Sequence, residues 1–161
     1  MPPSALPWLT KSCISSSCVA DSPAEAVDSA ILWSDGASRN NPGPAAIGVV
    51  LKRPTGELLA SDAEYIGKTT NNVAEYRALL RGLERARALG VRNLEVRADS
   101  ELLIRQLQGQ YRVKNAALKP LWEEAKERLS HFASVRLKHV RRELNTEADA
   151  LANAALDQAG F

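Results

Sequence analysis

Four acidic residues stand at positions where an acid is costly or unusual. Asp35 follows a short apolar run, and Asp99 closes the alternating segment 93–99. Glu75 and Asp149 fall at the margin of the apolar stripe of two predicted amphipathic helices. A buried carboxylate costs several kcal/mol unless it is paired or holds a metal. The four acids therefore need partners.

Divalent cations are the partners that best suit such a set. The apolar segments of the chain carry no matching set of cations, and clustered carboxylates repel one another. Oxygen-rich carboxylate sites suit Mg²⁺ or Mn²⁺. Two such ions about 3.5–4 Å apart are the usual machinery for displacement at phosphorus. The acids together predict a metal-dependent site for phosphoryl chemistry.

Each acid taken alone also fits a structural role. Asp35 could cap the turn that follows it, and Asp99 could be the N-cap of the next helix. Glu75 and Asp149 could simply interact with the positive end of a helix. Four such acids, at strand ends and in first helical turns, favour the shared chemical role.

The elements that must position these acids follow one another along the body of the chain. Apolar runs, alternation and glycine stops predict strands at 30–35, 45–54, 57–67, 93–99 and 134–140, and helices at 72–89, 100–109, 116–130 and 145–160. The last helix has Asn145 or Thr146 as its N-cap. Three meander strands followed by α/β alternation predict an α/β fold, with a mixed five-stranded sheet and helices on its faces.

Composition indicates one globular domain preceded by an extension. The 161 residues are 45% apolar and 25% charged, with a net charge of +2. Residues 1–29 are rich in proline and serine, and we expect a poorly ordered extension there and a catalytic domain at 30–161. Both cysteines, Cys13 and Cys18, lie in the extension, where they are free, paired or half of a metal site. The cysteine-free body favours a reducing, cytoplasmic setting, and no apolar stretch is long enough for a membrane span.

Five motifs in order resemble those of the type 1 ribonuclease H family. They read DGASRNNPGPAAIGVVL, TTNNVAEYRALLRGL, VRADSELLIRQLQG, YRVKN and HVRRELNTEADALANAA. The resemblance covers residues 30–158 and implies the ribonuclease H-like fold, a five-stranded mixed sheet with its first three strands antiparallel. Some relatives insert a basic protrusion after the short helix, and here only residues 108–115 stand at that place. The chain is similar to the form that lacks the protrusion.

The resemblance implies both an activity and a set of residues. The family binds RNA/DNA hybrids and cuts the RNA strand with two Mg²⁺ ions, for which Mn²⁺ is a substitute, leaving 5′-phosphate and 3′-hydroxyl ends. Its carboxylates correspond to Asp35, Glu75, Asp99 and Asp149. By this resemblance Asp35 bridges both ions, while Glu75 and Asp99 hold the ion that activates the attacking water. Asp149 helps to hold the ion that faces the leaving oxygen.

The resemblance also implies a mobile histidine in the loop before the last acid. Counting back ten residues from Asp149 reaches His139, which the strand prediction puts near the end of 134–140. His139 is then either the histidine that assists proton transfer or product release, or an ordinary strand residue. In the second case Arg141 or Arg142 lies nearer the site, and an arginine there steers phosphate but does not act as a base.

Substrate contacts carry over from the family in the same way. In the family, residues at these positions contact the hybrid's minor groove or grip a phosphate of the DNA strand. The corresponding residues here are Asn41, Thr70, Asn71, Asn72, Glu101 and Asn115. Glu101 stands where many relatives have glutamine, so base-edge contacts there differ. Asn and Thr also form turns, which is the alternative role for most of these positions.

Two other functional classes remain open on this fold. One is a catalytically weak nucleic-acid-binding module, against which the presence of all four acids argues. The other is a nuclease of the same fold with another substrate, against which the segment TTNN before Glu75 argues. We expect a monomer that binds an RNA/DNA hybrid and no membrane.

Overall fold

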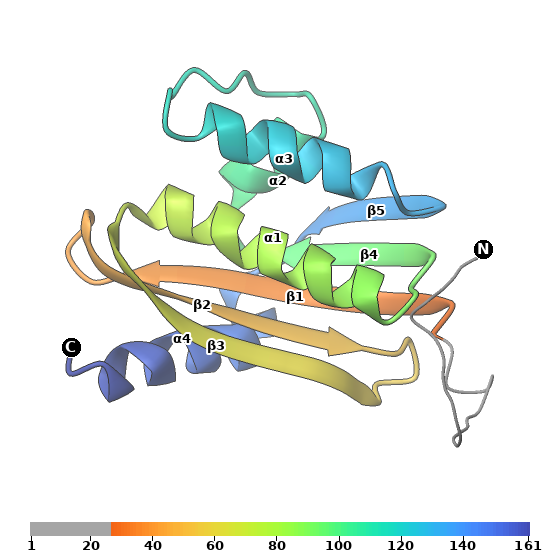
Figure 1. Cartoon of the computed structure of the whole chain (residues 1–161), viewed down its shortest axis with the longest axis horizontal. Helices are drawn as coiled ribbons and strands as arrows, with labels where there is room; N and C mark the ends of the chain where they lie inside the picture. Colours follow the sequence, from red (N-terminus) through yellow and green to blue (C-terminus); the bar gives the residue numbers. More distant parts are fainter. Residues whose placement is uncertain (1–26) are drawn as a thin grey trace.

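A computed structural model describes residues 27–161 of the chain (Figure 1). Its strands are β1 (Ser29–Ser38), β2 (Gly43–Lys52), β3 (Leu58–Thr69), β4 (Asn93–Ala98) and β5 (Ser134–His139). Its helices are α1 (Asn71–Ala88), α2 (Glu101–Leu107), α3 (Lys119–Leu129) and α4 (Thr146–Gln158), with a 3-10 turn, η3 (Arg142–Leu144), before α4. The predicted order of strands and helices is confirmed.

One five-stranded sheet has the order β3-β2-β1-β4-β5. β1 pairs antiparallel with β2, and β2 with β3, whereas β4 lies parallel to both β1 and β5. The sheet is antiparallel from β3 to β1 because tight turns connect these strands. It is parallel from β1 to β5 because helices lead into β4 and β5. The predicted mixed sheet with three antiparallel strands first is therefore confirmed.

Helices cover both faces of this sheet. α1 crosses one face in front of the central strands, with α2 and α3 beside it, and α4 lies on the other face against β2 (Figure 1). The apolar stripe predicted for the first long helix is buried, since Tyr76, Leu79 and Leu83 are each 0–1% exposed. Burial of this stripe is the main force that fixes α1 on the sheet.

Local chemistry sets the ends of α1. The Thr70 hydroxyl caps the helix by accepting a hydrogen bond from the Val73 N–H at 3.3 Å. Gly90, with φ of 79°, ends it as predicted. Glu75 consequently falls in the second turn, with its side chain on the sheet side of the helix.

Two glycines let helices approach the sheet on opposite faces. A Cβ atom built at Gly36 would lie 2.3 Å from the Ala74 carbonyl carbon in α1. One built at Gly48 would lie 2.0 Å from the Ala148 carbonyl oxygen in α4. Any side chain at either position would push a helix away from β1 or β2. Both helices that carry predicted acids are thus seated on residues without side chains.

Several boundaries differ from those predicted. The third helix begins at Lys119, not at residue 116, because the Asn115 side chain accepts the Ala117 N–H and closes a turn first. Asn145 is the N-cap of α4 by position, but its side chain makes no capping bond there. Ser100, not Asp99, caps α2 through a bond to the Leu103 N–H.

The start of the folded part also differs from the boundary expected at residue 30. Val27 is 2% exposed in the core, and the Asp28 carbonyl accepts the Asn93 N–H at 2.9 Å. β1 begins at Ser29. Residues 27–29 therefore pack with the domain, and the remainder of the predicted extension, with both cysteines, lies outside the described residues.

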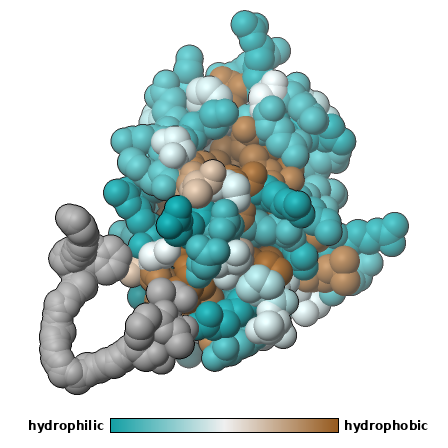
Figure 2. Space-filling view, turned by 90° about the vertical axis from the view of Figure 1, so that its right-hand side faces the viewer, coloured by the Kyte–Doolittle hydropathy of each residue, from teal (hydrophilic) through white to brown (hydrophobic). Residues whose placement is uncertain are grey.

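Hydrophilic side chains cover most of the face seen in Figure 2, with apolar residues visible between them. Within residues 27–161, no helix is long and apolar enough to cross a membrane. The apolar side chains instead gather in one main cluster between the sheet and α1, α2 and α3.

Replacing Gly36 by alanine should destabilise the domain by about 1–3 kcal/mol, because the new methyl group overlaps the backbone of α1. Urea unfolding of the purified chain measures the loss. Ser61→Ala, at an exposed position of β3, is the matched control and should change the free energy of unfolding by less than about 0.5 kcal/mol. A Gly36→Ala protein as stable as this control would contradict the close approach.

Candidate active site

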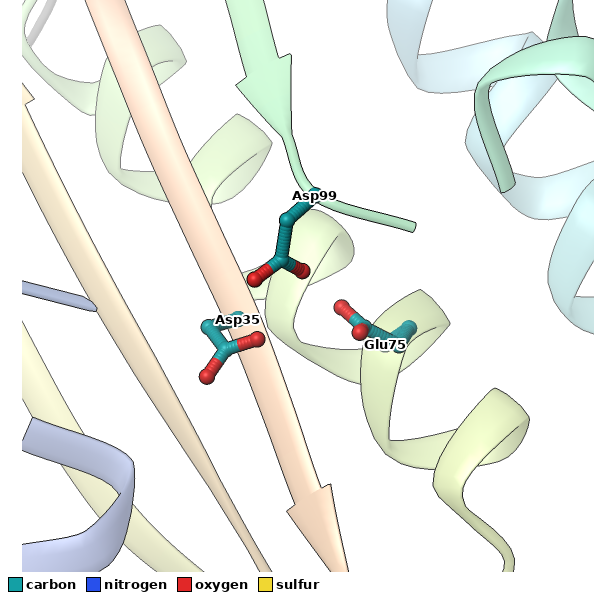
Figure 3. A group of neighbouring side chains, drawn as sticks. All are labelled: Asp35, Glu75 and Asp99. Carbon is teal, nitrogen blue, oxygen red and sulfur yellow. The ribbon is translucent and has the colours of Figure 1, made fainter. Parts of the chain in front are cut away.

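Three of the four predicted acids meet beside the middle of the sheet. Asp35, Glu75 and Asp99 each offer a carboxylate oxygen, and these oxygens lie within 4.8 Å of one another. Figure 3 shows the three side chains turned toward a common point, from β1, α1 and the end of β4. All three side chains are at most 5% exposed. They form what we call the carboxylate cluster.

Asp35 was predicted to end its strand, and that prediction is wrong. β1 continues to Ser38, and Asp35 pairs with Gly48 within the antiparallel ladder to β2. The parallel ladder with β4, however, ends at the pair Ser34 and Ala98, one residue earlier. Asp35 therefore lies where the parallel strands end, although its own strand does not, because β2 supplies partners for the extra residues.

Glu75 is bound to the strand next to Asp35. Its Oε1 accepts the backbone N–H of Gly36 at 3.1 Å. The bond is possible because Gly36 lets the second turn of α1 come within contact of β1. Gly36, the residue after Asp35, thus holds the Glu75 carboxylate in the cluster.

Asp99 follows the last residue of β4 and has an arginine as its nearest cation. The Arg142 Nε lies 3.8 Å from the Asp99 Oδ2, and the Arg142 side chain is 80% exposed. That Oδ2 atom is buried and has no hydrogen-bond partner among the described residues. A buried carboxylate oxygen without a partner is an unusual feature, which a bound cation would explain.

Asp149 lies half-buried in the first turn of α4, close enough to Asp35 that its charge and a side-chain hydrogen bond help to raise the pKa of Asp35. The buried Asn145 side chain anchors this turn, because its Nδ2 donates to the Ser34 carbonyl at 3.0 Å. Ser34 is the residue before Asp35, so this bond ties α4 to the strand that carries the first acid. Sequence reasoning missed this anchor and treated Asn145 only as a cap.

The cluster is electrostatically strained. Burial, followed by the charges of Glu75 and Asp99, raises the pKa of Asp35 to about 10. Burial and then the charge of Asp99 raise the pKa of Glu75 to about 8, against the opposing effects of the Gly36 N–H and Arg142. Like charges held together in a buried site resist ionisation, and both groups would ionise readily only beside added positive charge.

The residues present fit a divalent cation. All donors are carboxylate oxygens, three of them converge, and one is buried without a partner. Hard cations such as Mg²⁺ and Mn²⁺ prefer this donor set. The Arg142 guanidinium, almost fully exposed at 3.8 Å, neutralises little of the charge.

The two candidates for the mobile loop residue lie in different places. His139 is exposed and is the last residue of β5. Arg141 is exposed at the N-cap of η3, and Arg142 within η3 is the residue that approaches Asp99. The geometry brings Arg142, and not His139, into ion-pair distance of the cluster.

Four of the six predicted substrate residues lie in the turn between β1 and β2 or at the start of α1. The Asn41 Oδ1 accepts the Asn71 N–H at 3.0 Å, which joins the β1–β2 turn to the helix start. Asn72, two residues after the capping residue Thr70, is exposed.

Two further predicted substrate residues also have local structural partners. Glu101 forms an ion pair with Arg105 at 2.7 Å on α2. Asn115 is exposed and closes the turn before α3 through its bond to the Ala117 N–H at 2.7 Å. The oxygen atoms of Asn41, Thr70 and Asn115 thus have structural roles. Substrate contact through their remaining polar atoms stays a prediction.

Comparisons with known proteins agree with this geometry. A family described as "Reverse transcriptase-like" matches residues 33–155. A curated Ribonuclease HI from Halobacterium salinarum is 46% identical over 125 residues, covering 78% of this chain and 63% of that protein. A Mycobacterium tuberculosis bifunctional protein is 42% identical over 130 residues, covering 80% of this chain and 36% of its own length. The chain thus spans less than two thirds of these curated relatives.

Solved structures resemble the chain over nearly their whole length. RNase H1 from Halobacterium salinarum has a TM-score of 0.79 at 43% identity, covering 81% of this chain and 98% of that one. The N-terminal RNase H domain of a Mycobacterium tuberculosis protein has a TM-score of 0.80 at 41% identity, covering 82% and 96%. LC11-RNase H1, solved in complex with an RNA/DNA hybrid, has a TM-score of 0.78 at 43% identity, covering 81% and 98%.

The metal-free Asp35→Asn protein should be more stable than the wild type at pH 8, by about 1–3 kcal/mol. The pKa of Asp35 rises from 3.8 to about 10 on folding, so the folded chain binds more protons than the unfolded chain between these values. Its stability therefore falls as pH rises through that window, and asparagine removes the loss. Thermal melts in chelator at pH 5 and pH 8 measure the difference.

The control for this measurement is Glu123→Gln, at an exposed position of α3. It should change stability little, and equally at both pH values. A wild-type advantage over Asp35→Asn that grows with pH would show that the cluster is not under charge repulsion.

Proposed function

Because the chain belongs to the type 1 ribonuclease H family, we propose that it is an endoribonuclease. It hydrolyses the RNA strand of RNA/DNA hybrids and leaves 5′-phosphate and 3′-hydroxyl ends. The observation that carries the proposal is the convergence of three buried carboxylates within 4.8 Å. The hybrid bound to LC11-RNase H1, which is 43% identical to this chain, supports the substrate.

The cofactor in this proposal is Mg²⁺, bound as two ions, with Mn²⁺ as a substitute. Asp35, Glu75 and Asp99 would hold one ion, and Asp35 with Asp149 the other. Bound divalent ions supply a water nucleophile at neutral pH and relieve charge on the leaving oxygen. The raised pKa values of Asp35 and Glu75 in the metal-free chain support this assignment, because only a nearby cation restores the ionised forms.

The protein's own contribution is to place the reacting groups. Four carboxylates held by two strands and two helices define where the scissile phosphate lies, and the Gly36 N–H keeps Glu75 oriented. Arg142, nearly fully exposed beside Asp99, is positioned to steer a phosphate or the product. No side chain acts as a covalent nucleophile in this scheme.

Recognition of the hybrid is assigned to residues of the β1–β2 turn, the starts of α1 and α2, and the turn before α3. Asn41, Asn71 and Asn72 contact the minor groove and its 2′-hydroxyls, which distinguish RNA from DNA. Thr70 and Asn115 grip a phosphate of the DNA strand, and Glu101 contacts a base edge. The amide N–H₂ groups of the asparagines are the donors for these contacts.

The proposal extends to the setting of the protein. The cysteine-free body supports a reducing compartment such as the cytoplasm, and we propose a monomer. A catalytically weak binding module is the alternative, and another nuclease of the same fold is the second. Cleavage assays on the hybrid and on RNA and DNA duplexes separate all three.

A labelled RNA/DNA hybrid should be cut in its RNA strand only when Mg²⁺ is present, while RNA and DNA duplexes stay intact. Asp35→Asn should lower kcat by about a thousandfold or more, because it removes a charge that both ions share. Glu123→Gln, on the outer side of α3, should keep wild-type activity. Gel analysis of the products measures all of these, and metal-independent cutting or an active Asp35→Asn would reject the proposal.

Arg142→Ala should lower kcat by about tenfold, whereas His139→Ala should change it by less than about threefold. The reason is that Arg142 lies 3.8 Å from Asp99, while His139 ends β5 with an exposed side chain. Steady-state kinetics on the same hybrid measure both variants. The reverse order of effects would return the loop role to His139.

A further inference from the structure

The sheet has a face that α4 covers only in part. α4 packs on β2 and its neighbours β1 and β3. Beyond it, β4 and β5 present half-buried or exposed charged side chains on the same face, namely Glu95, Arg97, Arg136 and Lys138. These residues, together with Trp33 and Ile31 of β1, are called the open face below.

The register of the strands fixes the order of these residues. Trp33 pairs with Arg97, and Arg97 with Lys138, so one row crosses three strands. Asp35 stands two residues beyond Trp33, which puts it on the same face about 6.6 Å further along β1. The open face therefore continues directly into the carboxylate cluster.

Positive charge dominates this face. Arg97 is paired with Glu95 at 2.5 Å. Among the described residues, Arg136 and Lys138 have no ion-pair partner and both are exposed. β5 is an edge strand and leads through Arg141 to Arg142, at 3.8 Å from Asp99. A line of cations thus runs along β5 toward the cluster.

The open face also carries an aromatic group and a hollow. The half-buried indole of Trp33 lies between two cations, with the Lys52 Nζ at 5.6 Å and the Arg97 Cζ at 5.2 Å from ring centroids. Further from the cluster, a hollow of about 290 Å³ lies between Ile31, Pro54 and Arg136. Cations for phosphates combined with aromatic and apolar surface for bases are typical of single-strand binding.

We propose that the open face binds single-stranded RNA that continues from the RNA strand of the hybrid beyond the cleaved duplex. This proposal rests on the proposed function, because it assumes that the RNA strand of a bound hybrid passes the carboxylate cluster. Arg136 and Lys138 bind phosphates of this segment, and unpaired bases lie against Trp33 and in the hollow. A duplex cannot use these groups in the same way, because its bases are stacked inside.

The test compares one hybrid in four forms: blunt, with an unpaired RNA extension of about ten nucleotides at the 5′ end or at the 3′ end of its RNA strand, and with a duplex extension of equal length. Affinity is measured in the Asp35→Asn background, so that no RNA is cut. The wild-type face should bind one of the RNA-tailed hybrids at least about fivefold tighter than the blunt one. Arg136→Ala/Lys138→Ala should lose this gain and reduce the salt slope for the tailed hybrid by about 1.4.

The matched control is Arg87→Ala/Lys126→Ala, which removes two exposed cations from α1 and α3. It should keep the gain from the tail. Equal affinity for tailed and blunt hybrids, an equal loss in the control, or a larger gain from the duplex extension would each overturn the proposal.

Cleavage of the blunt hybrid by Arg136→Ala/Lys138→Ala, without the Asp35 change, should match the wild type within about twofold. If the wild type fails to cut the blunt hybrid, the proposed function is wrong. The affinity for the tailed hybrids, measured without cleavage, still decides whether the open face binds single-stranded RNA. A loss of blunt-hybrid cleavage as large as the loss of tail affinity would overturn the assignment to the flanking strand.

Discussion

The carboxylate cluster depends on one close approach of two backbones, that of α1 to β1 at Gly36. Because Gly36 has no side chain, the peptide between Ala74 and Glu75 lies against the strand, and the Gly36 N–H binds the Glu75 carboxylate. Gly48 allows the corresponding approach of α4 on the opposite face. The acids converge because the elements that carry them are packed backbone to backbone.

This convergence has an energetic cost that the rest of the domain offsets. Burial and mutual repulsion raise the pKa of Asp35 to about 10 and that of Glu75 to about 8. The apolar cluster between the sheet and α1 supplies the favourable burial that holds these groups together without a cation. Holding these carboxylates together lowers the stability of the fold, and it leaves a site in which a cation binds readily.

Some of the basic side chains form ion pairs, and others have no ion-pair partner among the described residues. On α1, Arg81 and Arg85 bind Glu64 and Asp62 of β3, which neutralises part of their charge. On β5, in contrast, Arg136 and Lys138 have no such partners among residues 27–161. The two exposed cations of β5 therefore remain available to a ligand on the open face, although the net charge of the chain is only +2.

The sequence by itself determined the element order, the mixed sheet, the helix stop at Gly90 and the acids worth examining, because these depend on periodicity, turn chemistry and residue type. It could not place Asp35 inside its strand, since that depends on β2 supplying partners beyond the end of β4. Nor could it assign Asn145 to the Ser34 carbonyl, or prefer Arg142 over His139 near Asp99. Those contacts join residues from distant parts of the chain, and only the packing of the helices on the sheet decides them.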